Sequence, residues 1–536
     1  MAKAAPETQL PLVEMEVRTE PTPSEPPGPE PPRLPRLKPI ERTQTEWRSI
    51  AAEDLLEKNH AARAIWELLG RLDLSGFYGH IKSIEGTAGQ DTLDPRLLIC
   101  VWVYAYSEGV SSAREVSRRC DYHPVYQWLT GMRSINYHTL ASFRVQYKEA
   151  LDGLFAQLLA VLQQEGLIEL RRVMVDGTKI EAVASKSSMH REKTLQQHLA
   201  EAQKRVEEMG KESDHDSQEG NDRQEAARKR AAEEKLKRMQ AAMVELEKVQ
   251  KERAGETPAE ECRVSESEPE ARKMKHADGS FSPSYNTQVS TDAGAGIIVG
   301  VQVIQAGNDQ GQLGPALDEV QRQCQQTPAQ AVVDGGYLNR ATVLEMQERG
   351  VDLVSSGNLE ATRDPAQAIR NYEQRGVAPN FYPQEFHYDA ERDLYVCPAE
   401  KELPHRGVKL DREGVERHQY RASASSCREC PFQRQCCPQD NSKSVRGRII
   451  VRTRNVPVVA AFVEKMKTPE AQAVYKKRKQ IAEFPNLWIK EKLGLRRFRV
   501  RGLAKVNCEA LWACLTYNVQ QWIRLRWRPS LETPLA

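Results

Sequence analysis

Two aspartates stand where a short apolar run gives way to glycine, a position from which a carboxylate can bind a ligand. Asp176 follows Val173–Val175 in VMVDG, and Asp334 follows two valines in VVDGGY. Either Asp-Gly pair alone is most simply a turn. The two together are more informative, because open α/β sheets place ligands beyond the carboxyl ends of neighbouring strands. Carboxylates side by side repel each other unless a cation lies between them, and Mg²⁺ is a natural partner for oxygen ligands.

A third acid lies in a basic segment near the C-terminus. Glu483 occurs in VYKKRKQIAEFPNLWIK, and residues 476–505 contain 11 Lys or Arg against two Glu. This much positive charge favours a polyanion. In a regular helix Tyr475, Lys479 and Glu483 share one face, and Lys490 lies seven residues further on. Taken alone, Glu483 is more simply a surface acid in a salt bridge.

The elements that must position these acids alternate between strands and helices. We predict a strand, an Asp-Gly turn and a second strand in residues 171–184. Further along, the pattern predicts two strands joined by a Gly-containing turn (284–305), a helix (311–325), a strand (329–337), a helix (341–349) and a strand (351–356). Such alternation indicates an α/β core with a partly parallel sheet.

The rest of the chain differs from this core in composition. Residues 1–44 are rich in proline and are predicted to be disordered, and residues 526–536 form a short tail. Residues 45–165 have helical periodicity. Residues 189–262 carry two coiled-coil seams and predict a helical hairpin. The many charged residues of this hairpin are most simply explained by exposure to solvent. Residues 357–450 are polar and contain cysteines, with little core of their own.

The helical N-terminal segment contains a candidate DNA reader. Ser111 is a plausible N-cap for a short helix that carries Arg114, Arg118 and Arg119, and a second short helix follows a break at 121–124. Two short helices around a tight turn are compatible with a helix-turn-helix. The alternative, which this segment alone favours, is an ordinary helical bundle with a basic surface.

A cluster of cysteines marks a candidate metal site. Cys397 precedes CRECPFQRQCC, which supplies Cys427, Cys430 and Cys436, with Cys437 adjacent. Four thiolates with one CxxC pair suit a structural Zn²⁺ or, less well, an iron–sulfur cluster; the alternative is reduced cysteines in a loop. Six other cysteines are expected to be ordinary thiols: Cys100, Cys120, Cys262, Cys324, Cys508 and Cys514.

Composition excludes several classes of protein. At 536 residues and 60.7 kDa the chain should hold more than one domain. Its net charge is only +2, so any basic surface must be local. No apolar run approaches the roughly 18 residues that span a bilayer, and the N-terminus has no secretory signal pattern. A membrane protein, a secreted disulfide scaffold and a collagen-like fibre are therefore not expected.

Asp176, Asp334 and Glu483 in their sequence contexts resemble the Asp-Asp-Glu (DDE) triad of insertion-sequence transposases of the IS4/IS5-like superfamily, most closely the IS1182 group. The resemblance covers roughly residues 45–525. Supporting stretches are residues 94–120, 271–292, 305–315 and 495–506. One departure concerns the superfamily signature Tyr-x2-Arg-x3-Glu-x6-Lys, because four residues instead of three separate Arg478 from Glu483. Lys479 keeps the expected spacing, so helical geometry predicts that Lys479 faces the acid.

The resemblance implies a multidomain α plus α/β protein with an RNase H-like catalytic core. The core would comprise residues 166–188, 263–356 and 451–525, interrupted by the helical hairpin and by the Cys-rich insert, after a helical DNA-binding domain at 45–165. The three acids would hold two Mg²⁺ (or Mn²⁺) ions across a scissile phosphate. Tyr475, Arg478, Lys479 and Lys490 would contact DNA. A similar Cys pattern in that family favours Zn²⁺ at the cysteine cluster.

The implied activity is metal-dependent cleavage and strand transfer of an insertion sequence. Its partners would be double-stranded DNA, as terminal inverted repeats and target, and a second copy in a synaptic homodimer, with no membrane. The expected location is the bacterial cytoplasm, in association with the nucleoid. Two alternatives stay open: a catalytically inactive DNA-binding protein derived from a transposase, and an RNase H-like nuclease.

Overall fold

The structure is a computed structural model, and it describes residues 43, 45, 49–81, 83, 91–212, 222–255, 257–356, 359, 365–410, 416–438, 446–454 and 457–532. The chain divides into two units, Met1–Ile50 and Ala51–Ala536, and all helices and strands described below belong to the second. Nearly all of the predicted disordered segment 1–44 lies outside the described residues. Among the described helices, none is both long and apolar enough to cross a bilayer.

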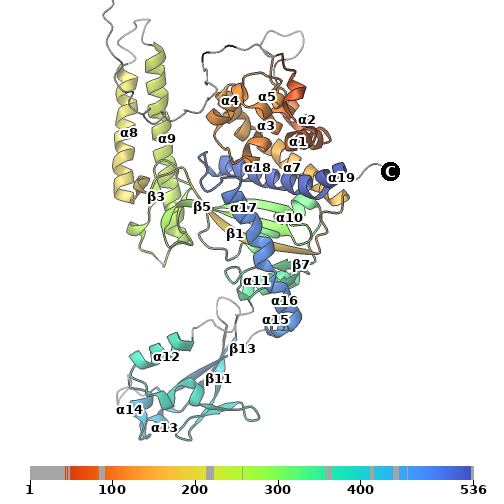
Figure 1. Ribbon diagram of the computed structural model, residues 1–536. Helices are drawn as coiled ribbons and strands as arrows, with labels where there is room; N and C mark the ends of the chain where they lie inside the picture. The colour runs from red at the N-terminus through yellow and green to blue at the C-terminus, as the bar shows by residue number, and fades with distance from the viewer. Residues whose placement is uncertain are drawn as a thin grey trace, which may run out of the picture. The chain divides into compact units, whose positions relative to one another are not determined.

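A six-stranded mixed sheet carries the predicted strands (Figure 1). Its members are β1 (Arg172–Glu181), β4 (Arg272–Lys275), β5 (Phe281–Asp292), β6 (Ile298–Ile304), β7 (Gln330–Val332) and β8 (Asp352–Val354). The order is β4-β5-β1-β7-β8, and β6 also pairs with β5. The pairings β5–β1 and β5–β6 are antiparallel, whereas β1–β7 and β7–β8 are parallel. The predicted α/β architecture with a partly parallel sheet is therefore confirmed.

The predicted turn at Asp176–Gly177 is wrong, because β1 runs through both residues without interruption. Gly177 serves close packing instead of chain reversal. A Cβ atom at Gly177 would lie 2.7 Å from the Nε2 atom of Gln288 and closer still to a carboxylate oxygen of Asp309. Glycine inside a strand commonly marks such an approach of neighbouring groups.

The helices α10 (Leu313–Cys324) and α11 (Arg340–Glu348) fall where the sequence predicted them. Gly296, in the turn between β5 and β6, has φ +71°, a left-handed conformation that favours glycine. The predicted Gly-containing turn is thus present.

The N-terminal helices are short and mostly apolar on one side. They are α1 (Ala61–Gly70), α2 (Ser75–Tyr78), α3 (Pro95–Ser107), α4 (Ala113–Tyr122), α5 (Pro124–Thr130), α6 (Tyr137–Gln146) and α7 (Lys148–Gln164). The predicted pair of short helices corresponds to α4 and α5. The predicted cap is off by one residue: the side chain of Ser112 accepts the amide of Glu115, whereas Ser111 is buried.

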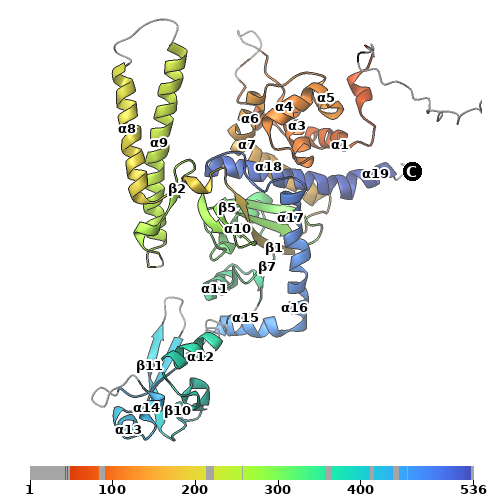
Figure 2. The ribbon, with the colours of Figure 1, turned by 60° about the vertical axis from the view of Figure 1, so that its left-hand side comes forward.

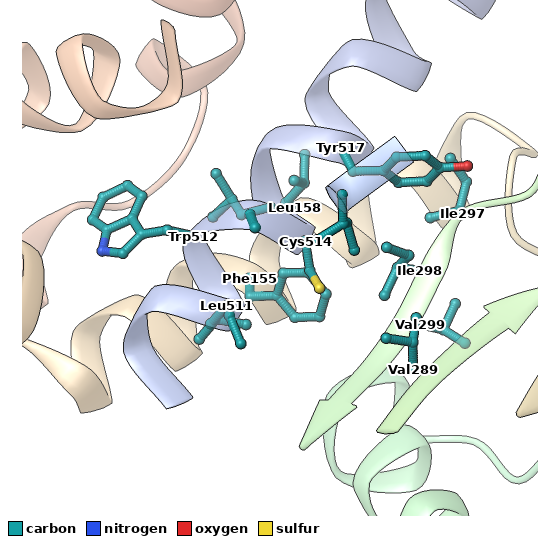
Figure 3. Packing of buried hydrophobic residues seen from close by; sticks show 14 of the residues in the cluster. Phe155, Leu158, Val289, Ile297, Ile298, Val299, Leu511, Trp512, Cys514 and Tyr517 are labelled. Atoms are coloured by element: carbon teal, nitrogen blue, oxygen red, sulfur yellow. The ribbon is translucent and has the colours of Figure 1, made fainter. Parts of the chain in front are cut away.

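The C-terminal helix α18 (Leu503–Trp522) joins these helices to the sheet. It packs on α3 and α7 and also on β6, and most of its residues are buried. In Figure 3, Cys514 lies beside Phe155 of α7. The Tyr517 hydroxyl donates to the carbonyl of Gly296 at 3.0 Å. The helix α18, which lies in the segment 451–525 that the resemblance assigned to the core, is thus a central core element.

A buried ion pair fastens α18 to α6. Arg144 Nη1 lies 3.4 Å from Glu509 Oε1, and both side chains are almost completely buried. Burial raises the pKa of Glu509, which the charge of Arg144 opposes. Arg144 also donates to the carbonyl of Ser111 at 2.6 Å.

Removal of the arginine charge should therefore destabilise this junction. We expect Arg144→Met to lower the opening free energy of α18, measured by hydrogen exchange, by about 3–5 kcal/mol, because a buried carboxylate loses its partner. Arg322→Met removes a half-exposed arginine paired with Glu319 and should cost less than about 1 kcal/mol. Equal effects of the two substitutions would contradict the assignment.

The predicted helical arms are present as α8 (Glu192–Glu212) and α9 (Asp222–Glu252), which pack side by side (Figure 1). Leu195 and Leu246, both from the predicted seams, are buried in one apolar cluster. The segment that joins the two arms, residues 213–221, lies outside the described residues. The short strands β2 (Met189–His190) and β3 (Val264–Ser265) pair at the base of the arms.

The cysteine-containing segment forms a second, five-stranded antiparallel sheet (Figure 2). Its strands are β9 (His387–Asp389), β10 (Leu394–Val396), β11 (Glu402–Leu410), β12 (Glu416–Arg421) and β13 (Ile449–Arg454), accompanied by α12 (Pro365–Gln374), α13 (Ala424–Arg428) and α14 (Gln433–Cys436). Leu403, Tyr420 and Ile450 form a small buried cluster there. The small size of this cluster agrees with the expectation of little core, and the sheet extends past the predicted boundary at 450.

The remaining helices lead from this sheet to α18 and beyond it. They are α15 (Pro457–Lys467), α16 (Pro469–Lys476), α17 (Phe484–Glu491) and α19 (Arg528–Glu532). The predicted tail 526–536 is helical up to Glu532, and residues 533–536 lie outside the described part.

Candidate functional site

Asp176 lies on β1, and Asp334 follows the end of the neighbouring parallel strand β7. The register pairs Met174 with Val332, so two further residues along each strand bring Asp176 level with Asp334. The side chain of Asp334 accepts the amide of Gly336 at 2.8 Å, which fixes it in the turn after β7. The charge of Asp334 contributes to raising the pKa of Asp176, as expected for acids close together.

Glu483 comes from a π-helical turn, Lys479–Glu483, that lies against β1 and β5. The guanidinium group of Arg478 connects Glu483 to Asp176. Arg478 Nη1 is 3.6 Å from Asp176 Oδ1, and Arg478 Nη2 is 3.4 Å from Glu483 Oε1. The Arg478 side chain is 12% exposed, whereas that of Glu483 is 50% exposed. The structure thus places Asp176 and Glu483 next to the same arginine side chain.

The prediction that Lys479 faces Glu483 is wrong. Lys479 is exposed, and Arg478 makes the contact. The reason is the π-helical turn, in which residues five apart in sequence lie one turn apart. Pro485 follows this turn: proline cannot donate a backbone hydrogen bond, and its ring would clash with the carbonyl four residues earlier in a regular helix. The wider π-helical turn therefore accommodates the one additional residue between Arg478 and Glu483.

Asn486, one turn beyond Glu483, was missed by sequence reasoning. Its Nδ2 atom donates to Asp176 Oδ2 at 2.9 Å. Lys490 is half-buried, and its pKa is lowered by burial and by Arg496, while Asp176 opposes this shift. Tyr475 is partly buried against the main core. Its predicted contact with DNA stays a prediction.

A fourth acid, Asp309, was also missed. It lies in the loop between β6 and α10, where Asn286 Nδ2 and Gln288 Nε2 donate to its Oδ1 atom at 2.8 and 2.7 Å. Gln288 in turn accepts from the hydroxyl of Tyr337. The only signal in the sequence was the stretch QAGNDQGQLGP, in which an acid lies shortly after a strand. Its proximity to Asp176 comes from the folded sheet.

Comparison with known protein families gives two matches. The model described as Transposase DDE domain matches residues 396–523, a range that includes Glu483. The model described as Transposase domain (DUF772) matches residues 50–146, which comprise most of the N-terminal helices. This combination is typical of IS1182-family transposases. The two matches together support a DDE transposase of an insertion sequence. Searches of curated proteins and of solved structures gave no match.

The transposase is accordingly a DNA-binding, nucleotidyl-transfer enzyme, and enzymes of this family generally use Mg²⁺ or Mn²⁺. The three predicted acids do not form a compact metal-binding cluster in this structure. In the described part of the chain, the ligand atoms of Asp176, Asp334 and Glu483 do not all lie within 4.8 Å of one another.

The residues nevertheless fit a cation. Burial raises the pKa of Asp176 to about 6; Arg478 and Asn486 lower it, and the charges of Asp334 and Asp309 raise it. A neighbouring cation would offset both the burial and the repulsion. The buried oxygens Asn286 Oδ1 and Asn486 Oδ1 have no hydrogen-bond partner among the described residues, so they are available to accept from ordered water.

The raised pKa of Asp176 gives the transposase a pH dependence. A carboxyl group must lose its proton before it binds a cation. We therefore expect Mn²⁺ affinity to fall as the pH drops through about 6. In Arg478→Gln the midpoint should move to higher pH, because the main charge that lowers the Asp176 pKa is gone. Above the midpoint Mn²⁺ should bind more tightly, because a competing cation has been removed.

Titration of Mn²⁺ binding between pH 5 and 8 checks both expectations. Lys476→Gln removes an exposed charge from the same helical segment and serves as the control. An unchanged midpoint in Arg478→Gln would separate Arg478 from the ionisation of Asp176.

The predicted cysteine cluster converges in the second sheet. Cys397, Cys427, Cys430, Cys436 and Cys437 line one cavity of about 30 Å³. The amide of Lys401 donates to Cys397 Sγ at 3.2 Å, and that of Arg448 donates to Cys427 Sγ at 3.4 Å. None of the eleven cysteines, all within the described ranges, forms a disulfide. The six cysteines expected to be ordinary thiols are buried.

Burial and the neighbouring thiols together raise the pKa of Cys427, although the amide of Arg448 opposes this shift. The pKa of Cys436 is raised by its contact with Cys437, whose sulfur lies 4.0 Å away, and by burial. Thiols crowded in this way favour a metal ion, which replaces their protons.

Proposed function

We propose that Asp176, Asp334 and Glu483 are the carboxylates with which this transposase cleaves and joins DNA strands. One observation carries the proposal: Arg478 lies within 3.6 Å of Asp176 and within 3.4 Å of Glu483. Asp334 follows the neighbouring strand β7, two residues past Val332, the residue that pairs with Met174. Acids separated by more than 300 residues thus meet at one face of the sheet.

An RNase H-like catalytic core is consistent with this arrangement. In such a core, two aspartates lie on neighbouring strands and a glutamate lies on a following helix. Here Asp176 belongs to β1, Asp334 comes two residues after the end of β7, and Glu483 belongs to the helical segment that contacts β1. In this interpretation the hairpin α8–α9 and the second sheet are inserts between parts of the core.

Asp176, Asp334 and Glu483 would hold the metal ions, with Asp309 as a fourth negative charge. Bound Mg²⁺ or Mn²⁺ would lower the pKa of the attacking hydroxyl and stabilise the leaving 3′-oxygen. Asn486 orients Asp176 through its hydrogen bond. Arg478 holds Asp176 and Glu483 together before metal binds, and its charge then becomes available to the scissile phosphate.

The basic side chains around this site suit the DNA backbone. Lys479 and Lys490, with Tyr475 beside them, would contact phosphates or bases. The helices α4 and α5 are a second candidate DNA contact. There, however, Arg118 and Arg119 both pair with Glu115, at 2.5 and 2.9 Å, which reduces the free positive charge.

The cysteine cavity is proposed as a structural Zn²⁺ site formed by Cys397, Cys427, Cys430 and Cys436. Two of these sulfurs, those of Cys397 and Cys427, accept hydrogen bonds from backbone amides, which helps to fix their positions at the cavity. Cys437 lines the same cavity and is an alternative ligand to Cys436.

The function is tested with the purified full chain, Mg²⁺ and a labelled duplex that carries the ends of the element. We expect nicking at the ends and joining of the released 3′-ends to target DNA. Cutting without joining would favour a nuclease, and binding without cutting would favour an inactive DNA-binding protein. A synaptic homodimer predicts that two end-bearing duplexes are recovered in one complex.

A further inference from the structure

A second group of potential metal ligands lies at the base of the helical hairpin. His190 ends β2, Glu266 directly follows β3, and His198 lies in the second turn of α8. Among the described residues, these three form the one group of His, Cys, Asp or Glu whose potential ligand atoms all lie within 4.8 Å of one another. Neither the acids of the proposed active site nor the cysteines meet this criterion.

The backbone around this trio is firmly held. His190 pairs with Val264 across β2 and β3, and the amide of Glu266 donates to the carbonyl of Ser188 at 3.0 Å. Leu195, one turn before His198 on α8, is buried in a cluster that includes Val264. The trio is thus presented by a strand pair and a packed helix.

Both imidazoles approach the same carboxylate oxygen. His198 Nδ1 is 2.7 Å from Glu266 Oε2, and His190 Nε2 is 3.7 Å from that oxygen. The first distance is a hydrogen bond, but the second is too long for one. The three side chains are between 24% and 32% exposed, so they are partly shielded and still reachable by an ion.

We propose that His190, His198 and Glu266 bind a Zn²⁺ ion. Zinc takes imidazole nitrogen at about 2.0–2.1 Å and carboxylate oxygen at about 2.0–2.2 Å, usually in a tetrahedron. Ligand atoms around such an ion lie about 3.3 Å apart, within the range spanned by this trio. Three protein ligands leave the fourth position to water. The ion would connect α8 to the β2–β3 pair.

Zinc counting in the full chain tests the proposal. We expect wild-type protein to bind one more equivalent of Zn²⁺ than either His190→Ala or His198→Ala, as measured by elemental analysis after removal of loosely bound metal. Glu266→Gln keeps an acceptor oxygen for His198 and removes the charge. It should weaken Zn²⁺ binding at this site by at least about 10-fold, as the loss of a supporting carboxylate does elsewhere.

Two controls separate this site from the cysteine cavity and from general damage to the hairpin. Gln197→Ala changes the exposed neighbour of His198 on the same helix and should keep the wild-type zinc content. With Co²⁺ in place of Zn²⁺, the thiolate charge-transfer absorption reports only on cysteine ligands. The histidine variants should therefore keep the wild-type intensity of that absorption and lose one equivalent of metal.

The result does not depend on whether the cysteines bind metal or the acids cleave DNA, because only the difference between wild type and variant counts. Zinc should also slow hydrogen exchange in the first two turns of α8 in wild type and not in His198→Ala. Equal zinc contents in wild type and both histidine variants would overturn the proposal, as would zinc-independent exchange of α8.

Discussion

Asp176→Asn should reduce DNA strand cleavage by at least about 1000-fold while the affinity for end-bearing DNA changes little. The substitution keeps the size of the side chain and its hydrogen bond from Asn486, but it removes the buried charge closest to Arg478. A lost ligand in a two-metal site removes stabilisation of both the attacking and the leaving oxygen. Asp334→Asn and Glu483→Gln should reduce cleavage by a similar factor, because the loss of any one member of a cooperating catalytic group removes most of the activity.

Matched acids outside the site provide the controls. Asp352 lies on the strand next to β7 and pairs with Lys465, so Asp352→Asn should retain cleavage. Glu491 ends the helix that follows Glu483 and pairs with Arg496, so Glu491→Gln should also retain it. Cleavage and filter binding are measured on the same duplex. Wild-type cleavage by any one of the three site variants would remove that residue from the triad.

The second large effect is expected at the cysteine cavity. Cys427→Ser combined with Cys430→Ser should remove one equivalent of Zn²⁺ and unfold the five-stranded sheet locally. That sheet has only a small apolar cluster, built on Leu403, Tyr420 and Ile450. A structural zinc site typically contributes most of the folding free energy of a domain with so small a core. Limited proteolysis and hydrogen exchange of β10–β12 in the full chain measure the loss.

Substitution of a buried cysteine outside the cavity is the control that distinguishes the effect of losing zinc from the effect of losing a thiol. Cys324→Ala changes a packed side chain on α10 and should leave both zinc content and protection of the second sheet intact. Unchanged protection and zinc content in the double variant would mean that the cysteines pack as ordinary thiols.

Local patterns in the sequence were sufficient to locate most elements. The apolar runs before Asp176 and Asp334 predicted strands that the structure contains as β1 and β7. The seams in the charged insert predicted the helices α8 and α9. The two family matches confirmed the resemblance to insertion-sequence transposases. The strands and helices could be predicted because hydrophobic periodicity is visible in short stretches of the sequence.

What could not be predicted depends on contacts between distant residues. Asp309 approaches Gly177 only after β5, β1 and the β6–α10 loop have assembled. Arg478 faces Glu483 because a π-helical turn precedes Pro485, whereas counting along a regular helix selects Lys479. The Asp-Gly pair at 176–177 looked like a turn because the crowding that requires glycine there is tertiary.

The position of α18 has a consequence for synthesis. The helix packs on β6, α3 and α7, yet it is synthesised after all three of them. Until it emerges, a nascent chain leaves the apolar surfaces of α3, α7 and β6 uncovered. Glu483 precedes α18 by only 20 residues, so the three acids also assemble late. The core that presents these acids can therefore be completed only after α18 has been synthesised.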